Sequence, residues 1–294
     1  MAKVDLHIHS TASDGTRSPG ELVIMAAGKS LSVISITDHD TLDGIPEGAD
    51  VAAELEIEFI PGVELSVDLE ESALTAHLLG YFPGVDIPLL VSRSHSLGKA
   101  IAYVQEGRSR RNPRILEKLA ENGIYIEMET VQLMAGGDVV GRPHIAEAMV
   151  DAGYVGSMNE AFSRFLAKGK PAYVERDRLS VSKAIEIIVE SGGLPVMAHP
   201  GYIEMDSKTL RSLFERMKGS GLAGIEVYYP SHTASMITTL KAFAREFQLV
   251  LTGGTDYHGR SNEATPLGGT EDGFHIEQED VKDFITLCRS RSRR

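Results

Sequence analysis

Two histidines, His7 and His9, stand one residue apart in the stretch "VDLHIHSTASDG" at residues 4–15. Side chains two positions apart on a β-strand point to the same face and lie about 7 Å apart. Two imidazoles placed in this way can converge on one metal ion just past the end of the strand. A single His-x-His pair is weak evidence of a metal site, so its meaning depends on the rest of the sequence.

Nearly every later predicted strand also ends in residues that commonly bind metals. Burying such groups without a partner costs several kcal/mol each, and a shared metal ion removes that cost. The residues are Asp38, His39 and Asp40 after "VISIT", Glu64 after "FIPGV", His77 within "LTAHLLG", His199 after "LPVMA", and Asp256 and His258 after "LVLTGGT".

Imidazole and carboxylate ligands without a thiolate suit Zn²⁺, Mn²⁺ or Fe²⁺ rather than a structural cysteine–zinc site. There are too many of these residues for one ion, so the sequence predicts two or three divalent ions. Clustered ions clamp an in-line displacement at phosphorus and generate a nucleophile at neutral pH. We therefore expect a hydrolase of phosphate esters.

Strand-like runs alternate with helical patterns, which is the rhythm of βαβ units. A return strand is expected at "ALTAHLLGYF", and helices are expected at "ELVIMAAGKS", "DVAAELE" and residues 180–191, 207–218 and 233–246. Counted together, the strands number about seven and are expected to be parallel. That number is enough to close an α/β barrel whose active site lies at the C-terminal ends of the strands.

Residues 84–172, between the two halves of this pattern, are predicted to be helical throughout. Leu116 and Leu119 mark one helix and Ile145 and Met149 another, while Ser157 stands at the start of a third. We expect an inserted helical subdomain.

The chain has 294 residues, of which 42% are hydrophobic and 24% charged, as in an ordinary globular protein. We expect no membrane span, and the absence of a signal-peptide pattern together with a single cysteine, Cys288, predicts a cytoplasmic protein without disulfides. The formal net charge of −13 argues against binding to duplex nucleic acid. The last six residues, "RSRSRR", are expected to form a solvated or disordered tail.

The motifs "DLHIHSTASDG", "ITDHDT", "PGVELS", "AHPG" and "TDYH" occur in an order that resembles the PHP (polymerase and histidinol phosphatase) phosphoesterases. The resemblance covers about residues 3–82 and 175–260. It implies a distorted seven-stranded TIM-like barrel at 1–83 and 173–294, with residues 84–172 as an inserted cap over the substrate. Within 84–172, "RRNPR", "GRPHIAE" and "FLAKGKPAYV" resemble the branch that holds 3′,5′-nucleotide bisphosphate phosphatases and 5′-to-3′ exoribonucleases.

The resemblance also implies a catalytic ligand set, and each of its nine positions carries a residue able to bind a metal. It assigns His7, His9, Glu64 and Asp256 to one ion, Asp14, His39 and His258 to a second, and His77 and His199 with Glu64 to a third. Some relatives carry histidine at the position of Asp14. A carboxylate there favours Mn²⁺ or Fe²⁺ over zinc at the second site.

Basic residues in 84–172 are predicted to bind a second phosphate. In "GRPHIAEAMV", Pro143 fits the first turn of a helix, which would put Arg142 and His144 at its positive end. In "RSRRNPR", Asn112 could cap a helix that begins at Pro113. Further candidates are Arg110 and Arg111 from this stretch, with Lys168 and Lys170 at a later helix end, although a solvated charge is the alternative for each.

Other histidines and aspartates have plainer interpretations. His95, His232 and His275 have no motif around them and are expected at the surface. Asp38 and Asp40 either accept hydrogen bonds from backbone N–H groups in their turn or support the ligand His39.

The leading functional hypothesis is removal of the 3′-phosphate from a nucleoside 3′,5′-bisphosphate, which gives an AMP-like 5′-monophosphate. Hydrolysis of short RNA from its 5′ end is a closely related activity. The alternatives are a phosphatase of the histidinol-phosphate type, an amidohydrolase-type C–N hydrolase and a binding module without turnover.

Overall fold

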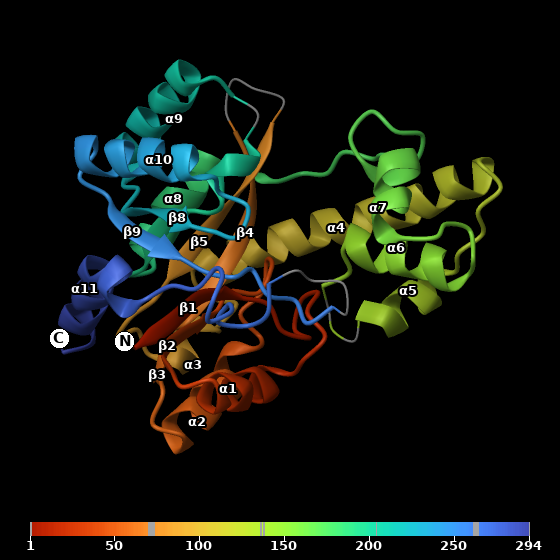
Figure 1. The fold of residues 1–294 in the computed structure, drawn as a ribbon. Helices are drawn as coiled ribbons and strands as arrows, with labels where there is room; N and C mark the ends of the chain where they lie inside the picture. Colours follow the sequence, from red (N-terminus) through yellow and green to blue (C-terminus); the bar gives the residue numbers. More distant parts are fainter. Residues whose placement is uncertain are drawn as a thin grey trace.

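A computed structural model describes residues 2–69, 74–135, 137, 139–203, 205–260 and 265–293 of the chain (Figure 1). The described residues form a mixed α/β fold with two sheets. One sheet has the strand order β1-β2-β3 and the other β6-β4-β5-β7-β8-β9. The strands are β1 (Lys3–Ile8), β2 (Leu31–Ile36), β3 (Glu58–Phe59), β4 (Gly62–Asp68), β5 (Thr75–Tyr81), β6 (Leu179–Ser180), β7 (Leu194–Met197), β8 (Gly224–Tyr228) and β9 (Val250–Gly253).

The expectation that all the strands are parallel is wrong for β5, which runs antiparallel to both β4 and β7. Positions 69–74 between β4 and β5 are too few for a parallel crossover, which needs a dozen residues or more. Single bridges connect the two sheets, from Ile8 to Tyr257 and from His39 to Glu64. The described residues show no continuous closed ladder, so the barrel stays a prediction.

Helices cover the sheets and form three apolar clusters with them, and a fourth cluster lies within residues 115–174 and contains no strand residue. The helices are α1 (Pro19–Gly28), α2 (Ile45–Glu54), α3 (Ile87–Leu90), α4 (Ser96–Glu121), α5 (Met128–Ala135), α6 (Arg142–Asp151), α7 (Met158–Ala161), α8 (Val181–Glu190), α9 (Ser207–Ser220), α10 (Ala234–Glu246) and α11 (Lys282–Ser292), with the short turns η1 (Phe162–Leu166), η2 (Pro200–Tyr202) and η3 (Gln278–Val281). The helices predicted near 180–191, 207–218 and 233–246 are present as α8, α9 and α10.

Helices α5, α6 and α7 gather around the far end of α4, on the opposite side of the molecule from α9 and α10 (Figure 1). The start of α4 belongs to the core of the larger sheet, where Leu97 and Ile101 are buried. Its end belongs to a separate cluster, where Ile115 and Leu119 pack with α6 residues such as Ile145. Helix α4 therefore links the sheets to the helical segment. The domain division at 84–172 stays a prediction.

Pro113 does not begin a helix, contrary to expectation, because α4 runs through it without interruption. Asn112 is buried and its side chain is used elsewhere: Oδ1 accepts from Arg111 at 2.7 Å, and Nδ2 donates to the Val140 carbonyl at 2.9 Å. Proline removes one helical hydrogen bond. The apolar contacts on both sides of this point keep the helix continuous.

The C-terminal segment is not a disordered tail, because α11 extends to Ser292. Phe284, Ile285 and Cys288 bury one face of this helix against the core. The guanidinium of Arg289 lies 2.6 Å from the carboxylate of Glu58. The tail is therefore exposed but helical as far as the described residues reach, and Arg294 lies outside them. Within the same residues, no helix is long and apolar enough to cross a lipid bilayer.

Replacing Phe284 with alanine should lower the free energy of unfolding by about 3–5 kcal/mol, because the fully buried ring packs edge-on against Tyr81 with centroids 4.9 Å apart. Urea denaturation measures this change. The matched control is Leu133→Ala, whose side chain is 84% exposed and whose loss should matter by less than about 0.5 kcal/mol. Equal effects of the two substitutions would contradict the burial of α11.

Candidate metal centre and anion-binding cavity

The end of β1 carries the first two members of the candidate metal centre. His7 and His9 are fully buried, and their Nε2 atoms face each other at 3.1 Å. Strand β1 thus points two imidazoles at one place, as the alternating pattern of a strand predicts.

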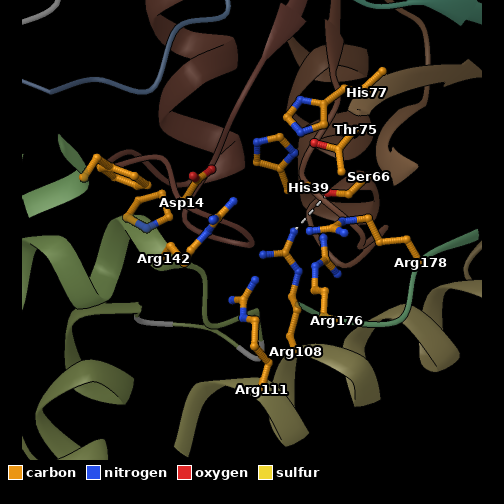
Figure 2. Close-up of a pocket in the computed structure, with 13 residues that line it drawn as sticks. Asp14, His39, Ser66, Thr75, His77, Arg108, Arg111, Arg142, Arg176 and Arg178 are labelled. Atoms are coloured by element: carbon orange, nitrogen blue, oxygen red, sulfur yellow. Dashed lines mark hydrogen bonds between the residues drawn. The ribbon is translucent and has the colours of Figure 1, made fainter. Parts of the chain in front are cut away.

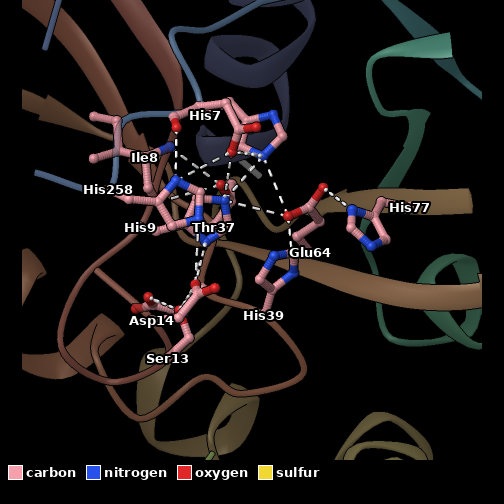
Figure 3. A network of polar contacts seen from close by, with 12 residues as sticks. His7, Ile8, His9, Ser13, Asp14, Thr37, His39, Glu64, His77 and His258 are labelled. Atoms are coloured by element: carbon pink, nitrogen blue, oxygen red, sulfur yellow. Dashed lines mark hydrogen bonds and ion pairs between the residues drawn. The ribbon is translucent and has the colours of Figure 1, made fainter. Parts of the chain in front are cut away.

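Glu64 on β4 lies at the middle of the cluster and is fully buried (Figure 3). Its Oε1 lies 2.9 Å from His77 Nδ1 and 2.9 Å from His199 Nε2. Its Oε2 lies 3.3 Å from His7, 3.2 Å from His9 and 2.9 Å from His39. One carboxylate therefore contacts five imidazoles that come from four strand ends.

The structure brings all nine predicted ligand residues close together. Three overlapping groups have ligand atoms within 4.8 Å of one another: His7, His9, Glu64 and Asp256; His9, Asp14, His39 and His258; and His39, Glu64 and His77. The first group has the same members as the first implied ion site. The second adds His9, and the third takes His39, whereas the resemblance implies His199.

Several buried atoms of the cluster make ion-pair contacts at most and no hydrogen bond among the described residues: His9 Nδ1, His39 Nδ1, His77 Nδ1 and Glu64 Oε2. Buried polar atoms are rarely left in this state, because each one costs free energy. Divalent cations would satisfy such atoms, and the donor set of imidazoles and carboxylates fits Zn²⁺, Mn²⁺ or Fe²⁺. The cluster is therefore able to bind metal.

The electrostatics of the cluster also favour a cation. Burial lowers the pKa of His9, but the carboxylates of Asp256 and Glu64 outweigh burial and raise that pKa to about 10. Burial raises the pKa of Glu64, yet His39, His77 and His7 hold it well below its usual range. Positive charge is stabilised here, either as a proton on imidazole or as a metal ion in its place.

Glu226, on β8, contacts the cluster, although the sequence reasoning did not identify it. Its carboxylate is fully buried, lies 2.9 Å from His7 Nδ1 and accepts from the His199 backbone N–H at 2.7 Å. An acceptor at Nδ1 fixes the ring so that Nε2 faces the cluster. The available signal was a glutamate inside the apolar strand "AGIEVYYP".

Asp38 and Asp40 both accept backbone hydrogen bonds, as one of their two interpretations predicts. Asp38 accepts from the Ser10 N–H at 2.7 Å and from the Ser13 hydroxyl at 2.6 Å, which holds the loop that carries Asp14. Asp40 accepts from the Ser66 N–H at 2.8 Å.

The carboxylate of Asp40 also accepts from Nε of Arg108 at 2.9 Å and from Arg176 at 3.3 Å. Burial raises the pKa of Asp40, but the two guanidinium groups hold it well below its usual range. Asp40 therefore links the metal cluster, through the adjacent His39, to a group of arginines.

His232 is buried rather than at the surface, which corrects the expectation for it. Its Nδ1 lies 2.9 Å from the Val227 carbonyl, and its Nε2 accepts from the Gly201 N–H at 3.2 Å. His232 thereby supports the turn that follows His199. His95 and His275 are partly exposed.

A cavity of about 170 Å³ opens onto the cluster at Asp14, His39 and His77 (Figure 2). Its other side is lined by five arginines that converge from α4, α6 and the segment before β6: Arg108, Arg111, Arg142, Arg176 and Arg178. Three of them are paired with carboxylates, since Arg108 and Arg176 contact Asp40, while Arg178 contacts Asp68 and Glu175.

The other two arginines, Arg111 and Arg142, have no ion pair among the described residues. Arg111 donates to Asn112 Oδ1, and Arg142 donates to the Leu166 carbonyl at 3.1 Å. Burial, together with the charges of Arg108 and Arg176, lowers the pKa of Arg111 well below its usual range. Buried guanidinium groups without a carboxylate partner bind anions such as phosphate, often through two parallel hydrogen bonds.

The structure separates the predicted phosphate-binding residues into two sets. Arg111 and Arg142 line the cavity. Arg110 faces outward and pairs with Glu106 and Asp177, because its position on α4 turns it away from Arg111. Lys168 and Lys170 are exposed and do not line the cavity.

His144 is also absent from the cavity lining, although it is buried as the third residue of α6. Its Nδ1 accepts from the Gly141 N–H at 3.1 Å. Burial lowers its pKa to about 4. His144 therefore caps the helix in its neutral form, and Pro143 lies in the first turn as predicted.

Comparison with known proteins agrees with this site. Residues 5–165 match the family model described as "PHP domain". The chain is 34% identical over 279 residues to a 5′-3′ exoribonuclease of Haemophilus influenzae, covering 95% of this chain and 96% of that protein. It is 32% identical over 273 residues to a 3′,5′-nucleoside bisphosphate phosphatase of Chromobacterium violaceum, covering 92% and 93%.

A solved structure from Chromobacterium violaceum, described as an amidohydrolase with bound sulfate and no metal, superposes with a TM-score of 0.84. It is 30% identical, and the match covers 99% of this chain and 97% of that one. The fold, the cluster and these similarities together define a metal-dependent phosphoester hydrolase. The chain belongs to the PHP domain family.

Substituting Glu226→Gln should weaken metal binding about 10- to 100-fold, because the carboxylate that orients His7 is lost while the shape of the side chain is kept. Calorimetric titration of the metal-free protein with Mn²⁺ measures the affinity. Glu129→Gln, on α5, is the control and should bind as the wild type does. Unchanged affinity in Glu226→Gln would contradict the orienting role.

Proposed function

We propose that the protein hydrolyses the 3′-phosphate of a nucleoside 3′,5′-bisphosphate and releases the 5′-monophosphate. The observation that carries this proposal is the cavity in which five arginines face the metal-binding cluster. The arginine cavity can bind one phosphate, and the cluster beside it can bind a second phosphate through its metal ions. This arrangement suits a substrate with two phosphates. The Chromobacterium violaceum relative is named a 3′,5′-nucleoside bisphosphate phosphatase, which is the same class of substrate.

The cluster would hold the metal ions and the reacting 3′-phosphate. His7, His9, Glu64 and Asp256 would hold one ion, Asp14, His39 and His258 a second, and His77 and His199 with Glu64 a third. When bound, divalent ions supply a nucleophile at neutral pH and neutralise the charge on the phosphoryl oxygens. We propose Mn²⁺ or Fe²⁺ at the second site because of the hard carboxylate of Asp14.

The arginine cavity would hold the 5′-phosphate, which does not react. Arg111 and Arg142 have no carboxylate partner within the described parts of the chain, so they can pair with this phosphate without breaking an ion pair. Asp40 would keep Arg108 and Arg176 in place around it. Binding energy from a remote phosphate then positions the 3′-phosphate at the cluster, where the reaction takes place.

We propose that residues 1–83 and 173–294 form a distorted barrel and that residues 84–172 form a helical cap over its substrate site. The single bridges between the sheets support the barrel, and the placement of Arg108, Arg111 and Arg142 on α4 and α6 supports the cap. The barrel would then supply the chemistry and the cap the second phosphate site.

The alternative substrates suit the cavity less well. Histidinol phosphate carries an ammonium group, which five arginines would repel. A neutral cyclic amide would leave the unpaired charges of Arg111 and Arg142 without a partner. The description of one similar structure as an amidohydrolase keeps C–N hydrolysis as the competing activity.

Arg111→Ala should lower kcat/KM for adenosine 3′,5′-bisphosphate about 10- to 100-fold, because one charge-assisted contact is worth about 1.5–3 kcal/mol. The effect on adenosine 3′-monophosphate, which lacks the 5′-phosphate, should be much smaller. Phosphate release measures both reactions.

The control is Arg110→Ala, the neighbouring arginine, which points away from the cavity and should keep the wild-type preference for the bisphosphate. An equal loss on both substrates in Arg111→Ala, or no loss, would contradict the role of the cavity. Faster turnover of histidinol phosphate or a cyclic amide than of any nucleotide would overturn the proposed function.

A further inference from the structure

A second cavity, of about 370 Å³, adjoins the arginine cavity, and Arg111 and Arg176 line both of them. We call it the outer cavity. None of the described residues that line it belongs to the metal-binding cluster. The outer cavity therefore extends the arginine cavity without touching the cluster. Its other lining residues are Gly107, Arg110, Arg114, Glu175 and Asp177.

Helix α4 and the segment before β6 form the walls of the outer cavity. Four residues of α4 line it at the spacing i, i+3, i+4 and i+7, which places them on one face of the helix: Gly107, Arg110, Arg111 and Arg114. The segment before β6 packs closely against this face, because a Cβ atom at position 107 would lie 2.9 Å from the backbone carbonyl oxygen of Asp177. Glycine at position 107 thus lets the two walls meet and bring arginines from both sides to one space.

The wall of the outer cavity is net positive, since four arginines and two carboxylates line it. Arg111 is buried and has no ion pair, and Arg114 is exposed and makes neither an ion pair nor a hydrogen bond within the described parts of the chain. The outer cavity thus offers an anion the guanidinium groups of these two residues. The other charged groups of the wall already have partners: Arg110 pairs with Asp177, Glu175 with Arg178, and Arg176 with Asp40.

Arg111 can contact a phosphate in each cavity. Its Nε and Nη2 donate to Asn112 Oδ1 at 3.1 and 2.7 Å, which uses two of the five N–H donors of a guanidinium. The remaining donors are enough for an anion in each of the two spaces that Arg111 lines. Two phosphates joined by one bridging oxygen would suit this arrangement, with one phosphate in each cavity.

We propose that the outer cavity binds a second phosphate joined to the 5′-phosphate, so that the protein also removes the 3′-phosphate from nucleotides that carry a diphosphate at the 5′ position. This inference rests on the proposed function, because it keeps the 5′-phosphate nearer the ribose in the arginine cavity and the 3′-phosphate at the cluster. Arg114 then contacts the terminal phosphate, and Arg111 contacts both phosphates of the diphosphate.

The reaction at the cluster is unchanged. A water oxygen bonds to the phosphorus of the 3′-phosphate, the bond between that phosphorus and O3′ breaks, and a proton passes to O3′. The products are inorganic phosphate and a nucleoside 5′-diphosphate. The bridging oxygen between the two 5′-phosphates keeps both of its bonds, because these phosphates lie among arginines and away from the cluster.

The test compares adenosine 3′-phosphate 5′-diphosphate with adenosine 3′,5′-bisphosphate as substrates of the Mn²⁺-loaded protein. The wild type should release adenosine 5′-diphosphate from the first substrate, with a kcat/KM within about tenfold of that for the second. In Arg114→Ala, the ratio of the two kcat/KM values should fall about tenfold, which is the low end for a charge-assisted contact because Arg114 is exposed. Arg216→Ala, at an exposed arginine on α9, is the matched control and should keep the wild-type ratio.

Competitive inhibition of bisphosphate hydrolysis separates binding from turnover. At equal free Mn²⁺, adenosine 5′-diphosphate should inhibit the wild type more strongly than adenosine 5′-monophosphate does. In Arg114→Ala this difference should shrink, whereas a purely structural role of Arg114 would weaken both inhibitors alike.

Three results would overturn this inference alone, in a wild type that hydrolyses the bisphosphate. They are a kcat/KM for the 5′-diphosphate substrate more than about tenfold below that for the bisphosphate, an unchanged ratio in Arg114→Ala, and cleavage between the two 5′-phosphates instead of at O3′. A wild type inactive on the bisphosphate would overturn the proposed function and this inference with it.

Discussion

A fully buried carboxylate that faces five imidazoles is stable only when their charges are balanced, and Glu64 is such a group. Its two oxygens reach histidines at the ends of β1, β2, β5 and β7. The antiparallel pairing of β4 with β5 places His77 opposite Ser66, two residues from Glu64, and so brings its imidazole to the carboxylate. Outer partners such as Glu226 and Asp38 then hold the histidines and the loop of Asp14 around this centre.

Negative and positive side chains lie in separate parts of the site. The cluster carries carboxylates that favour cations, whereas α4, α6 and the segment before β6 contribute five arginines that favour an anion. Asp40 separates the two regions: its backbone continues from His39, and its side chain contacts Arg108 and Arg176. The doubly phosphorylated substrate proposed above would be complementary to this division, because one phosphate would meet bound metal ions and the other would meet guanidinium groups. The same division would allow a chain with net charge −13 to bind such a substrate at this one place.

The sequence predicts the cluster well because strand ends meet at one edge of a sheet, so residues such as His39 and His199 converge although they are far apart in the chain. It predicts the anion cavity poorly. Arg176 and Arg178 lie outside any motif, and their approach to Arg111 depends on how α4 packs. The rotation of α4 also decides that Arg111 faces inward and Arg110 outward. The continuity of α4 through Pro113 likewise depends on tertiary packing, which local patterns do not contain. The direction of β5, by contrast, follows from the short connection at 69–74, which the sequence does contain.

Anomalous diffraction from crystals grown with saturating Mn²⁺ tests the central claim most directly, because it locates the ions without assuming a substrate. The account predicts peaks among the nine clustered residues. One peak should lie between His7, His9, Glu64 and Asp256, and another between Asp14, His39 and His258. Peaks found only outside the cluster, or no peak among these residues in well-ordered crystals, would contradict it.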